Sequence, residues 1–224
     1  MTLLHEFKDQ IKIAVSFDYG SKHNAIEIYY AKRNCKQLKI PHLRIPLSFI
    51  NKHFKSDLLK SGGEIPEGHY ADEVMKKTVV PFRNGIMLSI AAGLAESNDC
   101  SELYIGNHFG DHAIYPDCRM DFIKPMSEAI RNGTYKEIQL RSPYALLTKR
   151  EIALRGKEMK LNYDNSYSCY KGHSLFFLFG VPYADIHCGK CGTCVERIEA
   201  LKGFDTTEYE DDERAYFDTF IQPL

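Results

Sequence analysis

Residues 11–20 read Ile-Lys-Ile-Ala-Val-Ser-Phe-Asp-Tyr-Gly, and this stretch decides the fold. Its first seven residues are rich in β-branched and aromatic side chains and end at a turn signal, so they predict a buried strand. The following residues, 23–38, place apolar side chains on one helical face and predict a helix. A strand followed by a helix of this length is typical of a crossover between parallel strands.

The alternation of strand and helix continues along the chain. Further strands are predicted at 42–47, 102–106 and 137–140, and further helices at 84–97, 118–131 and 148–159. The last helix begins with a Thr-x-x-Glu capping box, Thr148 and Glu151. This order predicts a Rossmann-like α/β fold, with a parallel sheet and helices on both faces. Ligands of such folds bind beyond the carboxyl ends of the strands.

A Gly-rich segment, Ser61-Gly62-Gly63-Glu64, has the look of a nucleotide loop. The residues before it, 51–60, read as a helix, so no strand leads into the segment. A phosphate-binding loop of this kind follows a strand, and we therefore do not interpret the segment as one.

The composition is that of an ordinary globular protein. The 224 residues are 44% apolar and 26% charged, and the net charge of −1 gives no general attraction to nucleic acid or to an anionic membrane. Seven cysteines without a secretory segment indicate a reducing compartment, the cytoplasm. The most apolar stretch, 175–181, is far too short to span a bilayer and is typical of a hairpin or a subunit contact.

Four cysteines near the C-terminus have the spacing of a metal site. Two overlapping C-x-x-C steps join Cys188, Cys191 and Cys194, and Cys169 supplies a fourth thiol. The alternatives are a disulfide, an iron–sulfur site or unrelated thiols, but the bacterial iron–sulfur run needs a further cysteine four residues after the third, where this chain has Ile198. We interpret the set as a structural zinc site, because four thiolates leave no open coordination position for catalysis.

Three loop segments carry side chains suited to ligands. Arg83, before the helix at 84–97, offers donors for phosphate or carboxylate, and Asn84 could cap that helix, although a capped helix with a surface arginine is the commoner arrangement. The segment 106–119 suits a flat, hydrogen-bonding ligand, because an aspartate accepts from amino and ring N–H groups and an arginine pairs with a carboxylate. Alternatives for this segment are metal binding by two histidines, His108 and His112, or loop packing. Lys149 could face a phosphate or the solvent.

In their order and spacing, these segments resemble the 7-cyano-7-deazaguanine synthase family of PP-loop ATP pyrophosphatases. The resemblance covers residues 2–209 and rests on the segments 16–20 with His23, 80–84, 115–119, 142–144 with Lys149, 168–172 and 187–197. It implies an ATP-dependent ligase that adenylates 7-carboxy-7-deazaguanine, forms the amide with ammonia and activates that amide to give the nitrile.

The resemblance also implies a role for each candidate residue. Phe17, Arg83, Asn84 and Lys149 would face ATP and its Mg²⁺, Tyr115, Asp117 and Arg119 would face the deazaguanine, and the four cysteines would hold zinc. The implied assembly is a homodimer without a nucleic-acid or membrane partner. The expected division is an α/β domain at 1–165, a zinc-binding region at 166–200 and a tail at 201–224.

The chain departs from the family pattern in two places. The family begins with a strand and an S-G-G-x-D-S loop that binds pyrophosphate, whereas residues 1–7 read as the helix that follows this loop. We therefore expect the chain as given to be impaired. Residues 173–185 read as an insertion that should leave metal binding intact. Two rival interpretations are another PP-loop enzyme, such as a tRNA thiolase, and a noncatalytic zinc-containing module that binds a nucleobase.

Overall fold

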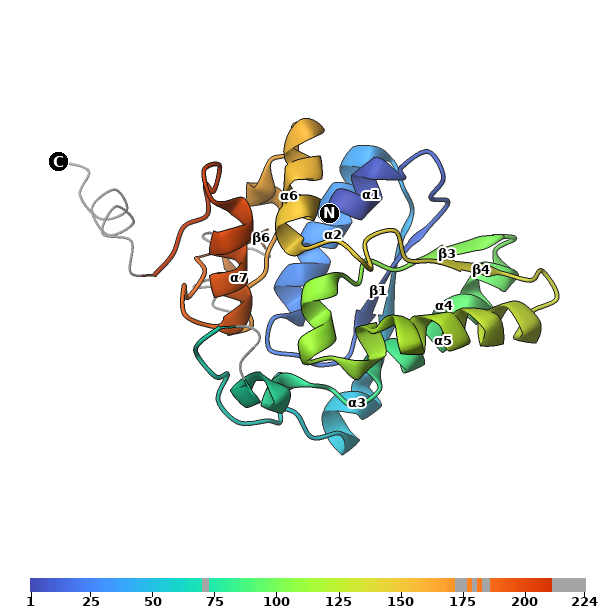
Figure 1. Cartoon of the computed structure of the whole chain (residues 1–224), viewed down its shortest axis with the longest axis horizontal. Coiled ribbons are helices and arrows are strands. Elements are labelled where there is room, and N and C mark those ends of the chain that lie inside the picture. Colours follow the sequence, from blue (N-terminus) through green and yellow to red (C-terminus); the bar gives the residue numbers. More distant parts are fainter. Residues whose placement is uncertain (70–72, 172–176, 179–180, 183–185, 211–224) are drawn as a thin grey trace.

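The α/β part of the molecule contains two pairs of parallel strands, and the β3–β4 pair lies toward the right in Figure 1. The computed structural model describes residues 1–69, 73–171, 177–178, 181–182 and 186–210. Strand β1 (Ala14–Asp18) pairs with β2 (His42–Pro46), and β3 (Glu102–Tyr104) pairs with β4 (Gln139–Arg141). Both pairs are parallel, as the alternation of elements predicts.

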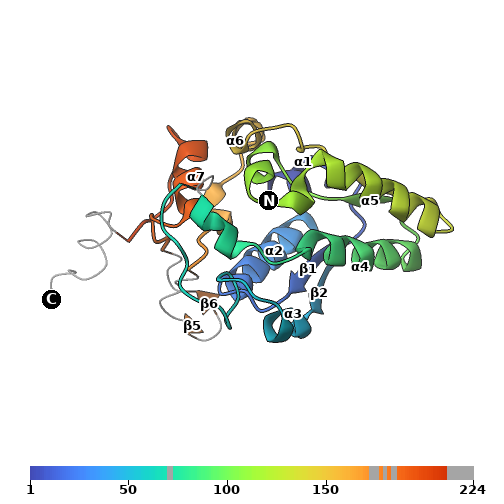
Figure 2. The ribbon, with the colours of Figure 1, turned by 60° about the horizontal axis from the view of Figure 1, so that its bottom comes forward.

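Helices lie between these strands in the sequence and pack against them. Helix α2 packs on β1 and β2, α4 on β3 and α5 on β4, and α4 and α5 lie side by side (Figure 2). The helices are α1 (Thr2–Glu6), α2 (Asn24–Leu38), α3 (Ser48–His53), α4 (Arg83–Ser97), α5 (Met120–Gly133), α6 (Lys149–Glu158) and α7 (Gly192–Leu201). The predicted parallel α/β fold is confirmed.

The remaining elements are short. They are 3-10 turns at Glu73–Thr78, Phe109–Ala113, Pro116–Cys118 and Tyr163–Asn165, and an antiparallel hairpin of β5 (Phe177–Leu178) and β6 (Val181–Pro182). The hairpin falls within the predicted insertion at 173–185, most of which lies outside the described residues. No helix in the described part of the chain is long and apolar enough to cross a membrane.

The predicted capping box starts helix α6. The Glu151 backbone N–H donates to Thr148 Oγ1 (3.2 Å), and the Thr148 backbone N–H donates to Glu151 Oε2 (2.7 Å). Two otherwise unpaired backbone donors are satisfied in this way, so the helix begins at Lys149. The cap therefore fixes where the Lys149 side chain leaves the backbone.

The helix predicted at 51–60 is wrong. Helix α3 ends at His53, and the chain then turns. Ser56 Oγ accepts from the Leu58 backbone N–H (3.2 Å), and the Asp57 N–H donates to the Lys77 carbonyl (2.8 Å), so local side-chain bonds replace helical ones. The Gly-rich segment 61–64 still follows no strand.

The first predicted strand begins late, and the expected single sheet is in two parts. Residues 11–13 lie outside β1, which starts at Ala14. Within the described residues, β1 and β3 have no hydrogen-bonded strand neighbour other than β2 and β4. A cavity of about 540 Å³ separates the two parts and is lined by α1, β1, α4, β3 and the loops beside them. Its lining is mainly apolar, with Val15, Met87 and Leu103 among the contributors.

The start of the predicted tail packs back on the cysteine region. The His187 N–H donates to the Glu208 carbonyl, and the Glu210 N–H donates to the His187 carbonyl, both at 2.9 Å. Residues 211–224 lie outside the described residues. The division into 1–165, 166–200 and 201–224 stays a prediction.

Candidate functional site

The four C-terminal cysteines converge on one point. Their side chains are fully buried, and their sulfurs all lie within 4.8 Å of one another: Cys169, Cys188, Cys191 and Cys194. No cysteine of the chain forms a disulfide. This group is the only metal-ligand cluster found within the described residues, so the disulfide alternative is wrong and the metal interpretation is supported.

The spacing of the sulfurs fits a tetrahedral metal. Four thiolates about 2.3 Å from a central zinc ion lie about 3.8 Å apart. The Cys188–Cys194 sulfur distance is 3.9 Å, Cys191–Cys169 is 4.0 Å and Cys191–Cys194 is 3.4 Å. The Cys191 backbone N–H donates to Cys188 Sγ (3.3 Å), as is usual around thiolate ligands. The donor set therefore fits a closed structural site.

The loop that carries Asp117 packs against the start of helix α4. The N-cap of α4 is Phe82, which has a left-handed backbone (φ 53°) and makes no side-chain cap bond. The Asn84 backbone N–H donates instead to Asp117 Oδ2 (2.8 Å), and Asn84 Nδ2 donates to the Asp117 carbonyl and to Cys118 Sγ, both at 3.2 Å. The prediction that Asn84 caps α4 is wrong, because a carboxylate from another loop meets the positive end of the helix dipole.

The first residue of α4, Arg83, lies among tyrosines. Its Nη1 donates to Tyr19 Oη (3.0 Å), and its guanidinium carbon is 5.4 Å from the Tyr19 ring centroid. Burial lowers the pKa of Arg83, but Tyr19, Tyr170, Tyr115 and Asp117 outweigh this effect and raise it well above its usual value. Within the described residues, no carboxylate forms an ion pair with Arg83. A cation held in this way is suited to a bound anion.

A histidine and a glutamate at the start of α2 pair with each other, and Arg83 acts electrostatically on the glutamate. His23 is 2% exposed and lies with Nε2 3.3 Å from Oε2 of the partly exposed Glu27, one turn along α2. Burial raises the pKa of Glu27, but His23, Arg83 and Lys149 outweigh burial and lower it below its usual value. Glu27 thus connects the starts of α2, α4 and α6 electrostatically.

Lys149 is held at the start of α6 by an acidic residue of α7. Its Nζ lies 2.7 Å from Glu196 Oε2. The loop before Pro116 borders this pair, since a Cβ added to Gly110 would lie 2.9 Å from Glu196 Oε1. Burial lowers the pKa of His108, which lies in the same loop. His108 Nδ1 accepts from the Gly110 N–H (3.1 Å), so the loop-packing alternative describes this histidine better than metal binding does.

The remaining predicted ligand residues lie in three different surroundings. Phe17 and Asn84 line the cavity between β1 and β3. Tyr115 is 4% exposed, and its hydroxyl lies 3.0 Å from Thr78 Oγ1. Arg119 is exposed and donates from Nε to the His112 carbonyl (2.8 Å), so it braces the loop.

Two residues of the region, Glu27 and Glu196, were given no binding or catalytic role in the sequence interpretation. Glu27 lies four residues after His23, and this i,i+4 spacing on a predicted helix was a usable signal. Glu196 gave no such signal, because its partner Lys149 is 47 residues away in the sequence.

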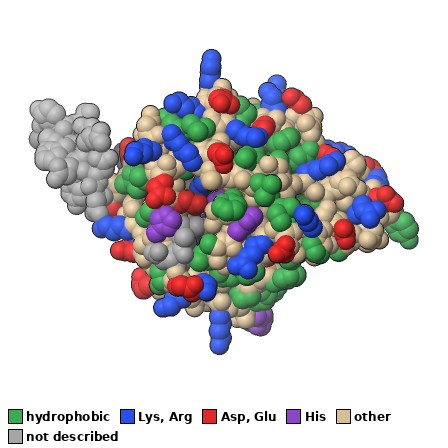
Figure 3. Space-filling view, viewed as in Figure 1, with side chains coloured by type: hydrophobic (Ala, Val, Ile, Leu, Met, Phe, Trp, Pro, Cys, Tyr) green, Lys and Arg blue, Asp and Glu red, His purple; other side chains and the backbone are tan. Residues whose placement is uncertain are grey.

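The molecular surface carries charges of both signs. Basic and acidic side chains are interspersed over the face seen in Figure 3. This mixture of charges agrees with the net charge of −1.

Comparisons with known proteins identify relatives along nearly the whole chain. The family model described as "Queuosine biosynthesis protein QueC" matches residues 1–205. A 7-cyano-7-deazaguanine synthase of Porphyromonas gingivalis is 54% identical over 213 residues, which cover 94% of this chain and 92% of that protein. Proteins of the same name from Desulfotalea psychrophila and Caldicellulosiruptor saccharolyticus are 47% and 41% identical, over 88% and 93% of this chain and 86% and 90% of their own lengths.

These matches agree with the family resemblance seen in the motifs, and they confirm the expectation of an enzyme rather than a noncatalytic module. The chain that gives these matches also has the four-cysteine cluster and the parallel α/β fold described above. The chain belongs to the QueC family of queuosine biosynthesis proteins.

Proposed function

We propose that the chain converts 7-carboxy-7-deazaguanine and ammonia into 7-cyano-7-deazaguanine with consumption of ATP, through an adenylated intermediate. One observation carries the proposal. The Arg83 guanidinium, at the start of α4, is held by Tyr19 and forms no ion pair with a carboxylate of the described residues. The names of the relatives supply the product, 7-cyano-7-deazaguanine.

The reaction needs cations to stabilise the negative charge on the phosphates of ATP. The substrate carboxylate attacks the α-phosphorus of ATP, pyrophosphate leaves, and ammonia then displaces AMP to form the amide. The amide oxygen then attacks the α-phosphorus of a second ATP, a second pyrophosphate leaves, and loss of AMP and of the two N–H protons gives the nitrile. Arg83 and Lys149 would stabilise the phosphate charge, and Mg²⁺ bound with ATP would screen it. Both cations act electrostatically on the same carboxylate, that of Glu27.

Asp117 is suited to the deazaguanine. One of its oxygens, Oδ2, accepts from the Asn84 N–H, and this bond fixes the carboxylate at the start of α4. Its second oxygen, Oδ1, makes no hydrogen bond within the described residues and would accept from the ring N–H and amino group. Tyr115 would then support this residue from the buried side, and Arg119 would hold the loop that carries it.

We infer that the cysteine cluster holds a structural Zn²⁺ ion. The ion would tie Cys169 to the start of α7 and thereby give this region a fixed shape. The support is the tetrahedral spacing of four fully buried sulfurs. Seven cysteines without a disulfide agree with a cytoplasmic enzyme, and the family resemblance favours a homodimer.

The cavity between β1 and β3 is suited to one further strand. Both strands have an edge without a partner in the described residues, and the cavity between them is mainly apolar. Parallel strands are ordinarily paired and covered on both faces. We propose that a strand followed by an S-G-G-x-D-S loop fills this cavity, and that activity is weak without it. The chain contains no such motif.

Product formation tests the function. Purified protein is given ATP, Mg²⁺, ammonium and 7-carboxy-7-deazaguanine, with and without an N-terminal segment carrying the strand and loop, and the nitrile is measured by mass spectrometry. We expect nitrile formation, strongest with the segment. Arg83→Gln should lower the rate by about 10- to 100-fold, the loss of one or two charge-assisted hydrogen bonds.

Arg131→Gln is the matched control, because Arg131 is an exposed residue near the end of α5. It should leave the rate unchanged. Absence of the nitrile with both forms of the protein would refute the proposed reaction, and equal effects of the two arginine substitutions would remove Arg83 from the site.

A further inference from the structure

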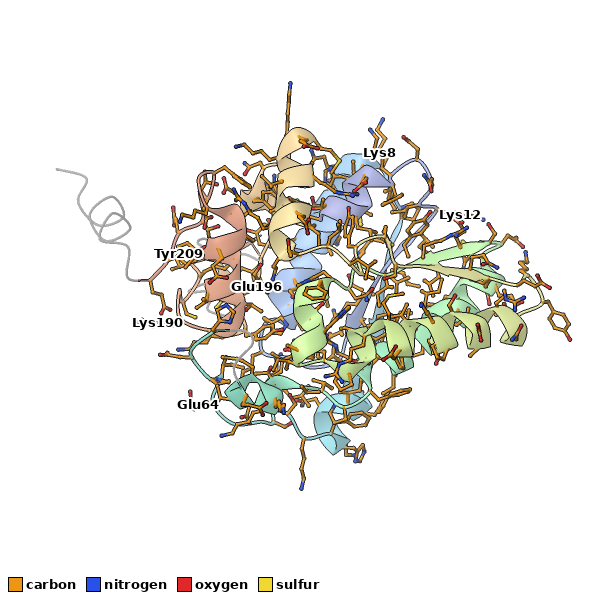
Figure 4. All side chains as sticks on the ribbon, in the orientation of Figure 1. Lys8, Lys12, Glu64, Lys190, Glu196 and Tyr209 are labelled. Atoms are coloured by element: carbon orange, nitrogen blue, oxygen red, sulfur yellow. The ribbon has the colours of Figure 1, made fainter. Side chains whose placement is uncertain are left out.

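Helix α7 connects the cysteine cluster to Lys149. It begins directly after Cys191 and carries Cys194 in its first turn. Two residues further on, Glu196 Oε2 lies 2.7 Å from Lys149 Nζ, and the two side chains are only 12% and 31% exposed. Figure 4 shows Glu196 on the side of α7 that faces the body of the molecule, whereas Tyr209 lies on the opposite side.

A second attachment holds the start of α6 against α7. Arg150 Nη1 donates to the backbone carbonyls of Ala200 and Lys202, both at 2.8 Å, at the C-terminal end of α7. Its guanidinium carbon lies 5.1 Å from the Phe204 ring centroid. Two consecutive residues of α6 therefore reach α7 at different turns, which limits both sliding and rotation of α6.

The Glu196 carboxylate is also confined from its other side. A Cβ added to Gly110 would lie 2.9 Å from Glu196 Oε1, so the Gly110 loop lies directly against this carboxylate. Glu196 consequently has the Gly110 loop on one side and Lys149 on the other. A carboxylate confined in this way gives a fixed position to the ammonium that it binds.

We propose that Glu196 is a positioning residue that holds Lys149 ready for the phosphates of ATP and links this lysine to the metal-binding cysteines. The inference rests on the proposed function. An unrestrained lysine side chain loses rotamer freedom when it is fixed. The ion pair meets this cost before ATP arrives, and since an ammonium has three N–H donors, a bond to Glu196 is compatible with a bond to phosphate.

The test compares Glu196→Gln with a matched variant, Glu199→Gln. Glu199 lies on the same helix but is 58% exposed and pairs with His69, away from Lys149. We expect Glu196→Gln to raise the KM for ATP by about five- to tenfold, with kcat and the KM for the carboxylate substrate within twofold of wild type. Glu196→Asp should be intermediate, and Glu199→Gln should match wild type. All variants should keep the wild-type metal content.

A double-mutant cycle shows whether Glu196 acts through Lys149. In a Lys149→Ala background, Glu196→Gln should have no further effect on the KM for ATP. Additive effects, an unchanged KM in Glu196→Gln, or loss of metal from that variant would each overturn the inference.

Calorimetric titration with ATP separates this inference from the proposed function. If wild-type protein binds ATP without turnover, the dissociation constants replace the KM values in the same cycle. If it neither turns over nor binds ATP, the proposed function fails and the inference fails with it. If wild type is active and Glu196→Gln behaves as Glu199→Gln does, only the inference fails.

Discussion

Replacing Cys169 by serine tests the role of the four-cysteine cluster in folding. Cys169 lies 19 residues before Cys188, and the other two cysteines follow within six residues of Cys188. A metal that joins Cys169 to the other three therefore closes a loop of this length. Closing such a loop restricts the unfolded chain by about 3 kcal/mol on the chain-entropy scale used for cross-links. Cys169→Ser should lose most of this stabilisation.

The expected signal is large enough to measure by thermal unfolding. In a chain of this size, 1 kcal/mol corresponds to about 2–4 °C, so Cys169→Ser should lower the Tm by about 6–12 °C. Zinc should fall well below one ion per chain, measured by atomic emission. Cys100→Ser is the control, because Cys100 is only partly buried and lies outside the cluster. An equal Tm for the two variants, with one zinc ion in each, would refute the reasoning.

Three further predictions concern other parts of the molecule. Thr148→Ala removes the side-chain acceptor of the α6 capping box and should cost about 1 kcal/mol, seen as a fall of about 2–4 °C in Tm; an unchanged Tm would mean that the cap is not needed. Because the folded pKa of Glu27 lies below its usual value, its contribution to stability is present above pH 4.5 and is lost as the pH falls through the folded pKa. Between about pH 3 and about pH 6, denaturant titrations should therefore show that Glu27→Gln loses less unfolding free energy on acidification than wild type does. An identical pH dependence in the two proteins would contradict this. Asp117→Ala should destabilise α4 by about 1 kcal/mol and weaken binding of the carboxylate substrate, whereas unchanged binding with lowered stability would leave Asp117 only a capping role.

Local sequence patterns predicted most of the helices and strands. The strand at 42–47 and the helices at 23–38, 84–97 and 148–159 were predictable because the apolar pattern of each lies within the segment, and the helix at 148–159 also carries its own capping box. The helix at 51–60 failed because Ser56 and Asp57 bond to nearby and distant backbone groups, which a periodicity argument does not include. The cysteine cluster was predictable from its spacing alone.

The site was harder to predict because its contacts are long-range. Sequence spacing identified Arg83 as a donor but assigned the α4 cap to Asn84, although the cap comes from Asp117, 33 residues later. The pairing of Lys149 with Glu196 spans 47 residues and depends on how α6 and α7 pack. Such pairings are fixed by tertiary structure and have no periodic signature in the sequence.

Exchange of labelled pyrophosphate into ATP is the most direct test of the central claim, that the region of Arg83, Asp117 and Lys149 couples ATP cleavage to a purine-like carboxylic acid. The exchange is measured with and without 7-carboxy-7-deazaguanine, in the absence of ammonia. The account predicts exchange that requires this acid and Mg²⁺ and that falls at least about tenfold in Arg83→Gln. Exchange that proceeds equally well without the acid, or that is unaffected by Arg83→Gln, would contradict it.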